Sequence, residues 1–223
     1  MDQQQEIAIG SKARKLRQRR QGAGTRELIF RAAMKEFSRF GYSGARMDRI
    51  ASTAKCNIRM VYHHFGKKKD LYRIVLEEAY VDIRQKEEAL QLTKLDPVEG
   101  MVRLLEFTFD HFMRHPEFVA LLTNENLMHG KFVLKSKKIT QTASPLRNAV
   151  ETLVKRGKEM KLFPADLDAV NMYVTIAALS WFHLSNAYTL SSMFGRDLTE
   201  AKFRETRQRH VRDVVKAYLS ASS

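Results

Sequence analysis

Apolar residues recur with the 3.6-residue period of an α-helix over most of the chain, and this period constrains the fold more than any other feature. Helical segments follow one another from Thr25 onward, and no segment of any length shows the alternation typical of a strand. Glycine and proline separate the segments, as at Gly41, Pro97 and Gly195. We therefore predict an all-α protein.

Three helices are expected near the N-terminus. The first begins at Thr25 as N-cap and stops at Gly41. Two short helices follow, Met47–Ala54 and Ile58–His64, and only residues 55–57 lie between them. Two short helices joined by a three-residue turn form a helix-turn-helix motif.

The remainder of the chain is helical almost throughout, with an ambiguous stretch over Gly130–Thr142. The expected helices are Lys68–Gln91, Pro97–His115, Glu117–His129, Ser144–Met160, Ala165–Met193 and Thr199–Leu219. Residues 1–23 show no apolar period, and a basic run within them predicts a flexible arm. The predicted organisation is an arm over 1–23, a helix-turn-helix domain over 24–72 and a larger helical domain over 73–223.

Positive charge is concentrated in the first third of the chain. The whole sequence carries a net charge of +14, and residues 1–75 hold 18 basic and 6 acidic residues, or +12. Because phosphate contacts supply most non-specific affinity for nucleic acid, this third is expected to bind a polyanion. An anionic membrane surface and a merely solvated basic face remain alternatives.

The compartment follows from cysteine usage and from the apolar segments. The single cysteine, Cys56, forms neither an intrachain disulfide nor a thiolate metal cage, and it occupies an apolar position where packing is expected. The opening residues have no apolar core of a signal peptide, and residues 172–182 are too short to span a bilayer. We expect a soluble protein of the cytoplasm, with no membrane partner.

Residues 25–72 resemble the DNA-binding domain of the TetR family of bacterial transcriptional repressors. The matching elements are Phe37-x-x-Phe40-Gly41-Tyr42, Ile50-Ala51, Val61-Tyr62-x-His64-Phe65 and Lys68-x-x-Leu71-Tyr72. The resemblance implies a homodimer that binds a palindromic DNA operator and is released by a small-molecule effector, so that no enzymatic activity and no cofactor are expected. In this family the second helix of the motif enters the major groove.

The third helix has the two faces that a recognition helix needs. Ile58, Val61 and Phe65 share an inner apolar face, and the polar residues lie outside it. Arginine reads guanine through two hydrogen bonds, and methionine contacts a thymine methyl group. The predicted DNA-binding residues are Arg46, Met47, Asn57, Arg59, Met60, Tyr62, His63 and Lys68. The family pattern assigns phosphate contacts to Tyr62 and Lys68, and for Tyr62 a buried ring is the alternative.

Three departures from the family pattern affect these assignments. Ala45 and Arg46 stand where Thr or Ser usually caps the second helix, which removes a cap worth about 1 kcal/mol. Lys55 replaces the usual turn glycine and must adopt a conformation that glycine adopts more easily. Lys67 replaces a neutral cap before the fourth helix. The added positive charge fits a phosphate-facing surface.

Residues 73–223 resemble the C-terminal domain of the same family, in a subgroup that includes repressors of pyrimidine-use and nicotinate-breakdown operons. The residues that suggest it include Glu125-Asn126, Gly157, Phe163, Trp181-Phe182, Asn186 and Phe194-Gly195. The resemblance implies an effector pocket among the middle helices and a dimer formed by the last two long helices. Surplus apolar positions such as Val174, Ala178, Trp181 and Leu184 favour the same dimer.

The predicted effector pocket combines apolar area with polar edges, as small-molecule pockets do. Its predicted lining is Phe107, His111, Asn124, Met128, Asn171 and Asn186. Phe107 and His111 are four residues apart and share a helix face. We expect a small, planar, partly polar ligand, and His111 in its protonated form would favour an acid. Alternatively, these polar side chains satisfy backbone groups inside a packed bundle.

Other functions find weaker support in the sequence. Asp110-His111-x-x-x-His115 has the spacing of metal ligands on a helix, but no third ligand is apparent, so no metal site is predicted. A DNA-binding nucleoid or cell-division regulator without an effector is one alternative, and it would lack a ligand-sized cavity. An all-α enzyme that binds an anionic substrate is another, and it would need titratable groups that converge in a pocket.

Overall fold

The computed structural model describes residues 3–220, with side chains described from Gly24 to Ser220, and no strand occurs within this range. The chain divides into two compact units between Leu76 and Glu77. We call them the N-terminal unit and the C-terminal unit. Their boundary falls inside helix α4 (Lys68–Glu88), a little after the residue 72 expected from the sequence.

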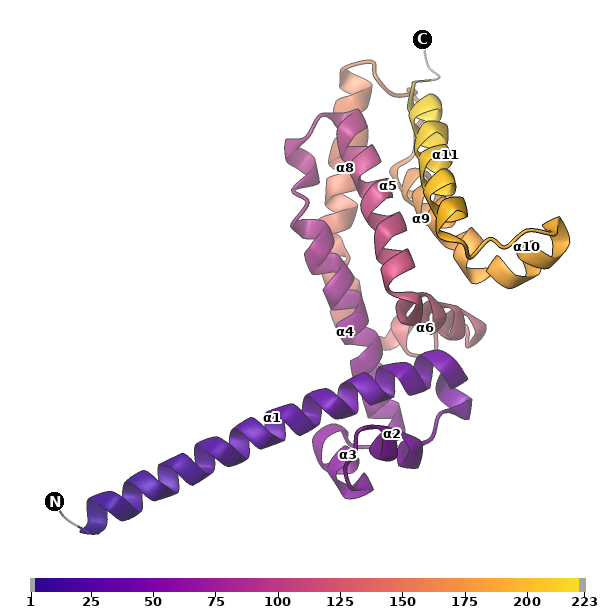
Figure 1. Cartoon of the computed structure of the whole chain (residues 1–223). Coiled ribbons are helices and arrows are strands. Elements are labelled where there is room, and N and C mark those ends of the chain that lie inside the picture. Colours follow the sequence, from indigo (N-terminus) through magenta and orange to yellow (C-terminus); the bar gives the residue numbers. More distant parts are fainter. Residues whose placement is uncertain (1–2, 221–223) are drawn as a thin grey trace. The chain divides into compact units, whose positions relative to one another are not determined.

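The N-terminal unit contains α1 (Gln3–Gly44), α2 (Met47–Thr53), α3 (Ile58–Phe65) and the start of α4 (Figure 1). The segment expected to be a flexible arm is helical from Gln3, and Thr25 lies inside α1 instead of capping it. Most residues of this segment are Gln, Lys, Arg and Ala, which are good helix formers even without an apolar period.

The end of the first helix lies where the sequence places it. Gly41 has a φ of 63° and interrupts the helical backbone of α1, a conformation that costs glycine little. Below it, the ring of Phe37 meets that of Tyr72 edge to face with centroids 5.0 Å apart. Ile50 from α2 and Val61 from α3 are also fully buried, so the three helices close around one small core.

The C-terminal unit is a helical bundle. After α4 come α5 (Pro97–Arg114), α6 (Pro116–Leu127), α7 (Lys137–Thr142), α8 (Ser144–Glu159), α9 (Ala169–Ser185), α10 (Ala187–Phe194) and α11 (Ala201–Leu219), with short 3-10 turns at Leu92–Lys94 and Val133–Lys135. Pro97 opens α5 as predicted, and Asp96 caps it by accepting from the backbone N–H of Val98 at 2.9 Å.

One predicted helix is divided. The expected helix Ala165–Met193 starts only at Ala169 and breaks at Asn186, where α9 ends and α10 begins. The Asn186 side chain donates to Phe182 O at 3.0 Å, so it occupies a carbonyl at the end of α9. An asparagine that binds the helix end competes with continuation of the helix.

Helix α5 lies at the centre of this bundle and packs against α8, α9 and α11 (Figure 1). Its inner face buries Met101, Leu104, Leu105 and Phe109 in a core shared with these helices. Gly157 of α8 allows the ring of Phe163 to lie directly on the helix, because a Cβ atom at this position would stand 2.1 Å from Phe163 Cδ2. The close contact between the Phe163 ring and the backbone of α8 therefore requires a glycine at position 157.

The stretch that was ambiguous in sequence is held by a buried carboxylate. Glu125 Oε1 accepts from the backbone N–H groups of Phe132 at 2.5 Å and Val133 at 2.8 Å. The next turn is joined to α4, since Ser136 Oγ donates to Glu77 Oε1 at 2.7 Å. None of the helices described is both long and apolar enough to cross a membrane.

Candidate nucleic-acid interface and effector site

Helix α3 presents an exposed face built on a buried one. Val61 and Phe65 are buried, as predicted for its inner face. Ile58 was expected beside them but is 37% exposed, because it lies in the first turn at the edge of that face. The side chains of Arg59, Met60, Tyr62 and His63 are all exposed.

Asn57 has a structural task that the sequence analysis did not assign. Its side-chain Oδ1 accepts from the backbone N–H of Arg59 at 2.8 Å, which makes it the N-cap of α3. The oxygen is therefore engaged in the cap, and the amide NH₂ group remains available as a donor to DNA. Asparagine before a short helix is a frequent N-cap, so this role was readable from the sequence.

The turn before α3 confirms the strain predicted at Lys55. This residue has a φ of 53°, in the left-handed region that glycine adopts more easily. Cys56 is half-buried beside it, and burial raises the pKa of its thiol. A protonated, half-buried thiol is poorly nucleophilic, which agrees with a packing role.

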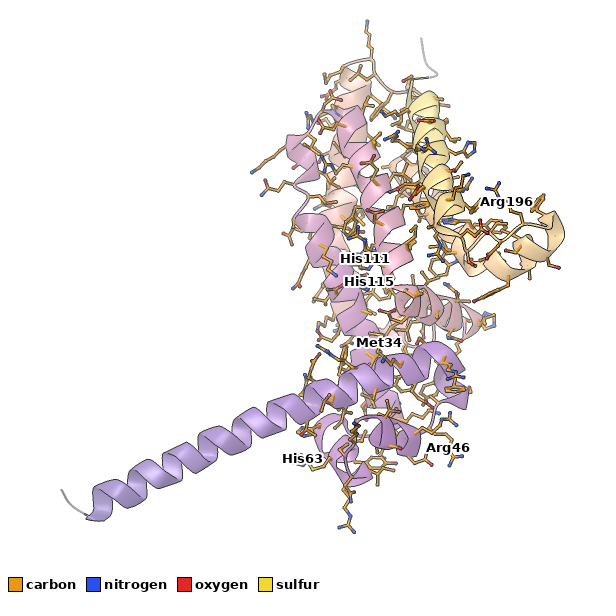
Figure 2. The ribbon with its side chains drawn as sticks, viewed as in Figure 1. Met34, Arg46, His63, His111, His115 and Arg196 are labelled. Carbon is orange, nitrogen blue, oxygen red and sulfur yellow. The ribbon has the colours of Figure 1, made fainter. Side chains whose placement is uncertain are left out.

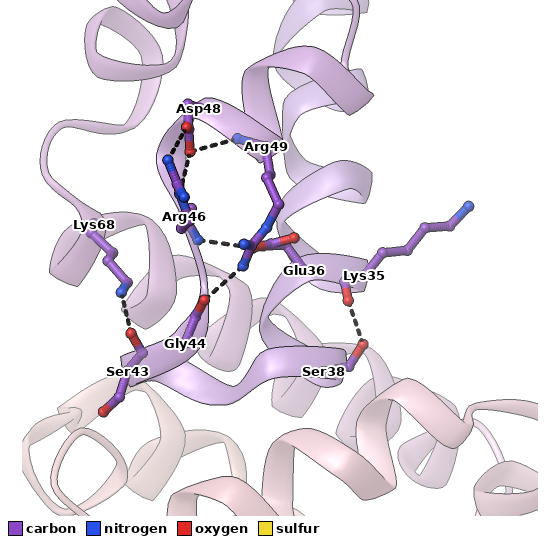
Figure 3. Close-up of polar contacts among 9 residues, drawn as sticks. All are labelled: Lys35, Glu36, Ser38, Ser43, Gly44, Arg46, Asp48, Arg49 and Lys68. Atoms are coloured by element: carbon purple, nitrogen blue, oxygen red, sulfur yellow. Dashed lines mark hydrogen bonds and ion pairs between the residues drawn. The ribbon is translucent and has the colours of Figure 1, made fainter.

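Met47, at the start of α2, was predicted to contact DNA, and its burial corrects this prediction. Its side chain is only 8% exposed and belongs to the core of the N-terminal unit, so it does not form part of a DNA-facing surface. Arg46 is exposed and forms a paired contact with Asp48, with Nη2 to Oδ2 at 2.6 Å and Nε to Oδ1 at 3.1 Å (Figure 3). This contact raises the pKa of Arg46 and lowers that of Asp48.

A side chain of α1 supplies the hydrogen bond that α2 lacks from an N-cap residue of its own. Glu36 is buried, and its Oε1 accepts from the backbone N–H of Arg46 at 2.8 Å. The same oxygen forms an ion pair with Arg49 Nη2 at 2.6 Å, and Arg49 also donates to Gly44 O (Figure 3). Within α2, Asp48 Oδ1 accepts from the backbone N–H of Arg49 at 2.9 Å. No local pattern marks Glu36 in the sequence, because its partners lie ten and thirteen positions away.

The two residues assigned to phosphate contacts differ in their surroundings. Tyr62 is 48% exposed, which excludes the alternative of a buried ring. Lys68 is half-buried, and its Nζ donates to Ser43 O at 3.2 Å (Figure 3). The same Nζ lies 5.0 Å from the centroid of the Tyr42 ring. Burial lowers the pKa of Lys68. An ammonium has three donors, so this contact still leaves donors for a phosphate.

The two neighbouring histidines of α3 differ in exposure. His63 is exposed, and Figure 2 marks it together with Arg46. His64 is half-buried, with its ring centroid 5.2 Å from that of His63. Burial lowers the pKa of His64, and its Nε2 has no hydrogen-bond partner among the described residues. His64 therefore packs on the helix flank, and His63 faces outward.

In the C-terminal unit, Phe107 and His111 come together as predicted, with ring centroids 5.6 Å apart. His111 is buried, and its ring also meets that of Phe118 edge to face at 5.6 Å. Burial lowers the pKa of His111 to about 4, so the imidazole is neutral at pH 7. This corrects the expectation that a protonated His111 attracts an acid.

The other four predicted pocket residues differ in exposure and in the contacts that they make. Asn171 is exposed in the first turn of α9, and Asn186 caps the end of that helix. Asn124 and Met128 are half-buried at the end of α6. The Asn186 side chain donates to a backbone carbonyl, as the alternative interpretation expects of such a residue.

A cavity of about 200 Å³ lies elsewhere in the C-terminal unit, between α4, α8 and the start of α9. Its lining is mostly apolar, with two guanidinium groups, a carboxylate and a phenol at its polar edge: Arg84, Ala143, Leu146, Arg147, Val150, Glu151, Ala169, Val170 and Tyr173. A second cavity of about 190 Å³ lies next to it, and Leu146 lines both. None of the six predicted pocket residues lines either cavity.

The polar edge of the 200 Å³ cavity is a buried network. Arg84 Nη1 pairs with Glu87 Oε2 at 2.5 Å, and its Nη2 donates to the hydroxyl of Tyr173 at 3.2 Å. Burial raises the pKa of Glu87 to about 7, although the guanidinium of Arg84 acts in the opposite direction. Arg84 Nε has no hydrogen-bond partner among the described residues.

A helix-turn-helix with an exposed polar recognition helix, joined to a separate helical bundle that holds a cavity, defines a DNA-binding transcription regulator. Family models agree over both units. Residues 29–75 match "Bacterial regulatory proteins, tetR family", and residues 97–215 match "Tetracyclin repressor-like, C-terminal domain".

The chain belongs to the TetR family of bacterial transcriptional regulators. It is 37% identical to the HTH-type transcriptional repressor NicS of Pseudomonas putida over 176 residues, covering 79% of this chain and 83% of NicS. It is 31% identical to the repressor SCO4008 of Streptomyces coelicolor over 70% of this chain and 77% of that protein.

Solved structures share the fold. The ketosteroid transcriptional regulator KstR2 of Mycobacterium tuberculosis superposes with a TM-score of 0.66 at 17% identity, over 89% of this chain and 94% of KstR2. The regulator FadR of Bacillus subtilis, solved in complex with stearoyl-CoA, superposes with a TM-score of 0.62 at 15% identity, over 86% of this chain and 98% of FadR.

Proposed function

We propose that this protein is a homodimeric repressor of the cytoplasm that binds a palindromic operator and is released by a small-molecule effector. The observation that carries the proposal is the exposed face of α3, where Arg59, Met60, Tyr62 and His63 stand on buried Val61 and Phe65. Two such helices, one from each protomer, would enter successive major grooves about one helical turn apart.

The DNA contacts proposed for the individual side chains follow from their positions in the motif. Arg59 and Met60 are proposed to read bases, whereas Tyr62, Lys68 and Arg46 are proposed to hold phosphates. Arg46 would exchange part of its contact with Asp48 for a phosphate oxygen, which an exposed arginine can do at low cost.

Selection from a random DNA library with the full chain tests this function. We expect recovered sequences to share a palindrome with two half-sites. Recovery of sequences without any common motif would contradict the proposal and favour a non-specific nucleoid protein.

The dimer is proposed to form through apolar side chains left exposed on the last three helices. These are Val170, Val174 and Phe182 of α9, Tyr188, Met193 and Phe194 of α10, and Val214 and Tyr218 of α11. A patch of this kind on a single chain marks an interaction surface, and an isologous contact would bury it on both copies. Sedimentation at micromolar concentration should give a dimer, and a monomer that still binds the palindrome would refute this arrangement.

The effector is proposed to occupy the 200 Å³ cavity beside Arg84, Arg147 and Tyr173, where apolar walls meet two guanidinium groups and the single carboxylate of Glu151. A small planar acid fits this composition, because a carboxylate pairs with guanidinium donors. The cavity also favours an effector-controlled regulator over one without an effector.

A release assay distinguishes this cavity from the Phe107–His111 pair. Arg147 is exposed, so Arg147→Gln should leave folding and operator binding intact and raise the concentration of acid needed for release. Phe107→Ala should not change that concentration. If Phe107→Ala shifts release and Arg147→Gln does not, the effector binds beside His111 instead.

A further inference from the structure

Three metal-ligating side chains converge at one place in the C-terminal unit. They are Asp82 of α4 and His111 and His115 from the last turns of α5, and one ligand atom from each lies within 4.8 Å of the others. Asp82 is the third ligand that the sequence analysis did not find, because 29 positions of chain separate it from His111. Asp110, which precedes the pair in sequence, instead accepts from Gln208 of α11 at 2.9 Å.

The two histidines are placed by helix geometry. Residues four apart lie one above the other on a helix, and the ring centroids of His111 and His115 are 4.4 Å apart with planes tilted by 39° (Figure 2). His115 ends α5 because Pro116 follows it, so its ring is held where the chain turns into α6.

The observed spacing is close to that of a bound metal. In a tetrahedral site with bonds of about 2.0–2.1 Å, neighbouring ligand atoms lie roughly 3.3 Å apart. The three groups therefore need to approach by about 1.5 Å at most, a movement that side-chain torsions of Asp82 and His115 supply, since Asp82 is exposed and His115 is half-buried.

The surroundings suit a site with a buried floor and an open side. His111 is buried against the rings of Phe107 and Phe118. Asp82 opens to solvent, which gives an entry path and room for a water ligand.

Two further charged groups face the cluster. Glu117 Oε1 lies 3.4 Å from His115 Nδ1, and a carboxylate beside a ligating imidazole is the usual outer-shell partner. Lys86 Nζ contacts Asp82 Oδ2 at 2.7 Å, and this exposed pair must loosen or share the carboxylate when a cation binds.

We propose that Asp82, His111 and His115 form a binding site for a divalent transition metal, with zinc as the ion that best fits the donor set. Two imidazole nitrogens and one carboxylate oxygen suit zinc and its first-row neighbours, whereas magnesium and calcium take oxygen ligands. A bound ion would join α4 to the end of α5 and stabilise the C-terminal unit by linkage. The site is separate from the cavity beside Arg84.

Titration of the metal-stripped protein with zinc chloride in a calorimeter tests the proposal. We expect one ion per chain, at least about 100-fold weaker binding in Asp82→Asn and in His115→Ala, and unchanged binding in the control His63→Ala. Both test substitutions lie at the open side of the site, so folding is retained, and circular dichroism checks it.

Cobalt binding, followed by visible absorption, provides a second measurement that is independent of calorimetry. Wild type should give the visible absorption of a nitrogen- and oxygen-ligated tetrahedral cobalt ion, and His115→Ala should lose it while His63→Ala keeps it. Equal zinc affinity in wild type, Asp82→Asn and His115→Ala would overturn the proposal. So would loss of binding only in His63→Ala, which would place the ion on α3.

Discussion

Charged and titratable side chains of the N-terminal unit lie mostly on its surface, whereas the C-terminal unit holds several of them inside. In the first, Arg59 and His63 are exposed, and Glu36 is the buried acid that joins α1 to α2. In the second, Arg84 and Glu87 form a buried pair, and His111 and His183 are buried neutral. A surface that binds a polyanion needs exposed cations, and a domain that senses a small molecule needs polar groups shielded from water.

The distance in sequence between contacting residues also explains which polar contacts could be predicted from the sequence. Some polar contacts of the N-terminal unit join near neighbours, as Asn57 joins Arg59 and Arg46 joins Asp48, although Glu36 reaches Arg46 and Arg49 from ten and thirteen positions away. The Arg84–Tyr173 contact of the C-terminal unit joins residues 89 positions apart. Local contacts follow from capping and helical spacing, but distant ones require the packing of the whole bundle.

Removing Arg84 is the strongest test of the buried interior. Arg84→Ala would leave Glu87 buried without its cation, and we expect the free energy of unfolding to fall by about 3–5 kcal/mol. The exposed pair of the N-terminal unit, Arg31 with Glu27, is the matched control, and Arg31→Ala should change stability by less than about 1 kcal/mol. Urea unfolding followed by circular dichroism measures the stability of both variants. Similar losses of stability in the two variants would contradict the difference described between the units.

Glycine substitutions compare packing in the two units. Gly157→Ala places a Cβ atom 2.1 Å from Phe163 Cδ2, and overpacking of this kind should cost about 3 kcal/mol. At Gly24 in α1 no atom of the described side chains, or of backbone outside its own helix, lies within 4 Å of the added Cβ, so Gly24→Ala should be neutral or stabilise by up to about 1 kcal/mol. Thermal unfolding that shows equal losses for both variants would contradict the assigned packing.

Histidine burial predicts a dependence on pH. His183 stacks on Phe109 with centroids 4.9 Å apart, and burial lowers its pKa from 6.5 to about 4. Because the unfolded chain takes up the proton first, the stability from a neutral His183 is present above pH 6.5 and is lost as the pH falls toward 4.

The variant His183→Phe keeps the ring stack and cannot be protonated. Between pH 7 and pH 5, wild type should lose about 2 kcal/mol more stability than this variant. His111 changes stability in the same direction and Glu87 in the opposite one, but both remain in the variant, so the difference isolates His183. Parallel curves of unfolding free energy against pH would show that His183 does not titrate as described.

The smallest stability effect concerns the replacement cap of α2. Glu36→Gln keeps the size of the side chain but weakens its bonds to Arg46 N–H and Arg49, and should cost about 1–2 kcal/mol. Glu27→Gln on the exposed side of α1 is the control and should cost less than about 0.5 kcal/mol. Equal effects in urea unfolding would mean that Glu36 does not support α2.

The sequence predicted the all-α class, the helix-turn-helix and most helix bounds, because these follow from apolar period and from punctuation such as Gly41 and Pro97. It misplaced Met47, which helical spacing alone cannot assign to core or surface. It also extended α9 through Asn186, and it found neither the partner of Arg84 nor Asp82 beside the histidines. Each of these depends on which helices pack together.

Binding of the selected operator and of a scrambled duplex of the same length, compared among three proteins, tests the central claim that α3 reads the operator. Arg59→Ala should weaken operator binding by about 1–3 kcal/mol and leave binding to scrambled DNA unchanged. Tyr62→Phe should weaken both by a similar factor, because it removes a phosphate contact. If Arg59→Ala lowers both affinities equally, Arg59 does not read bases and the assignment of α3 as the specificity-determining helix fails.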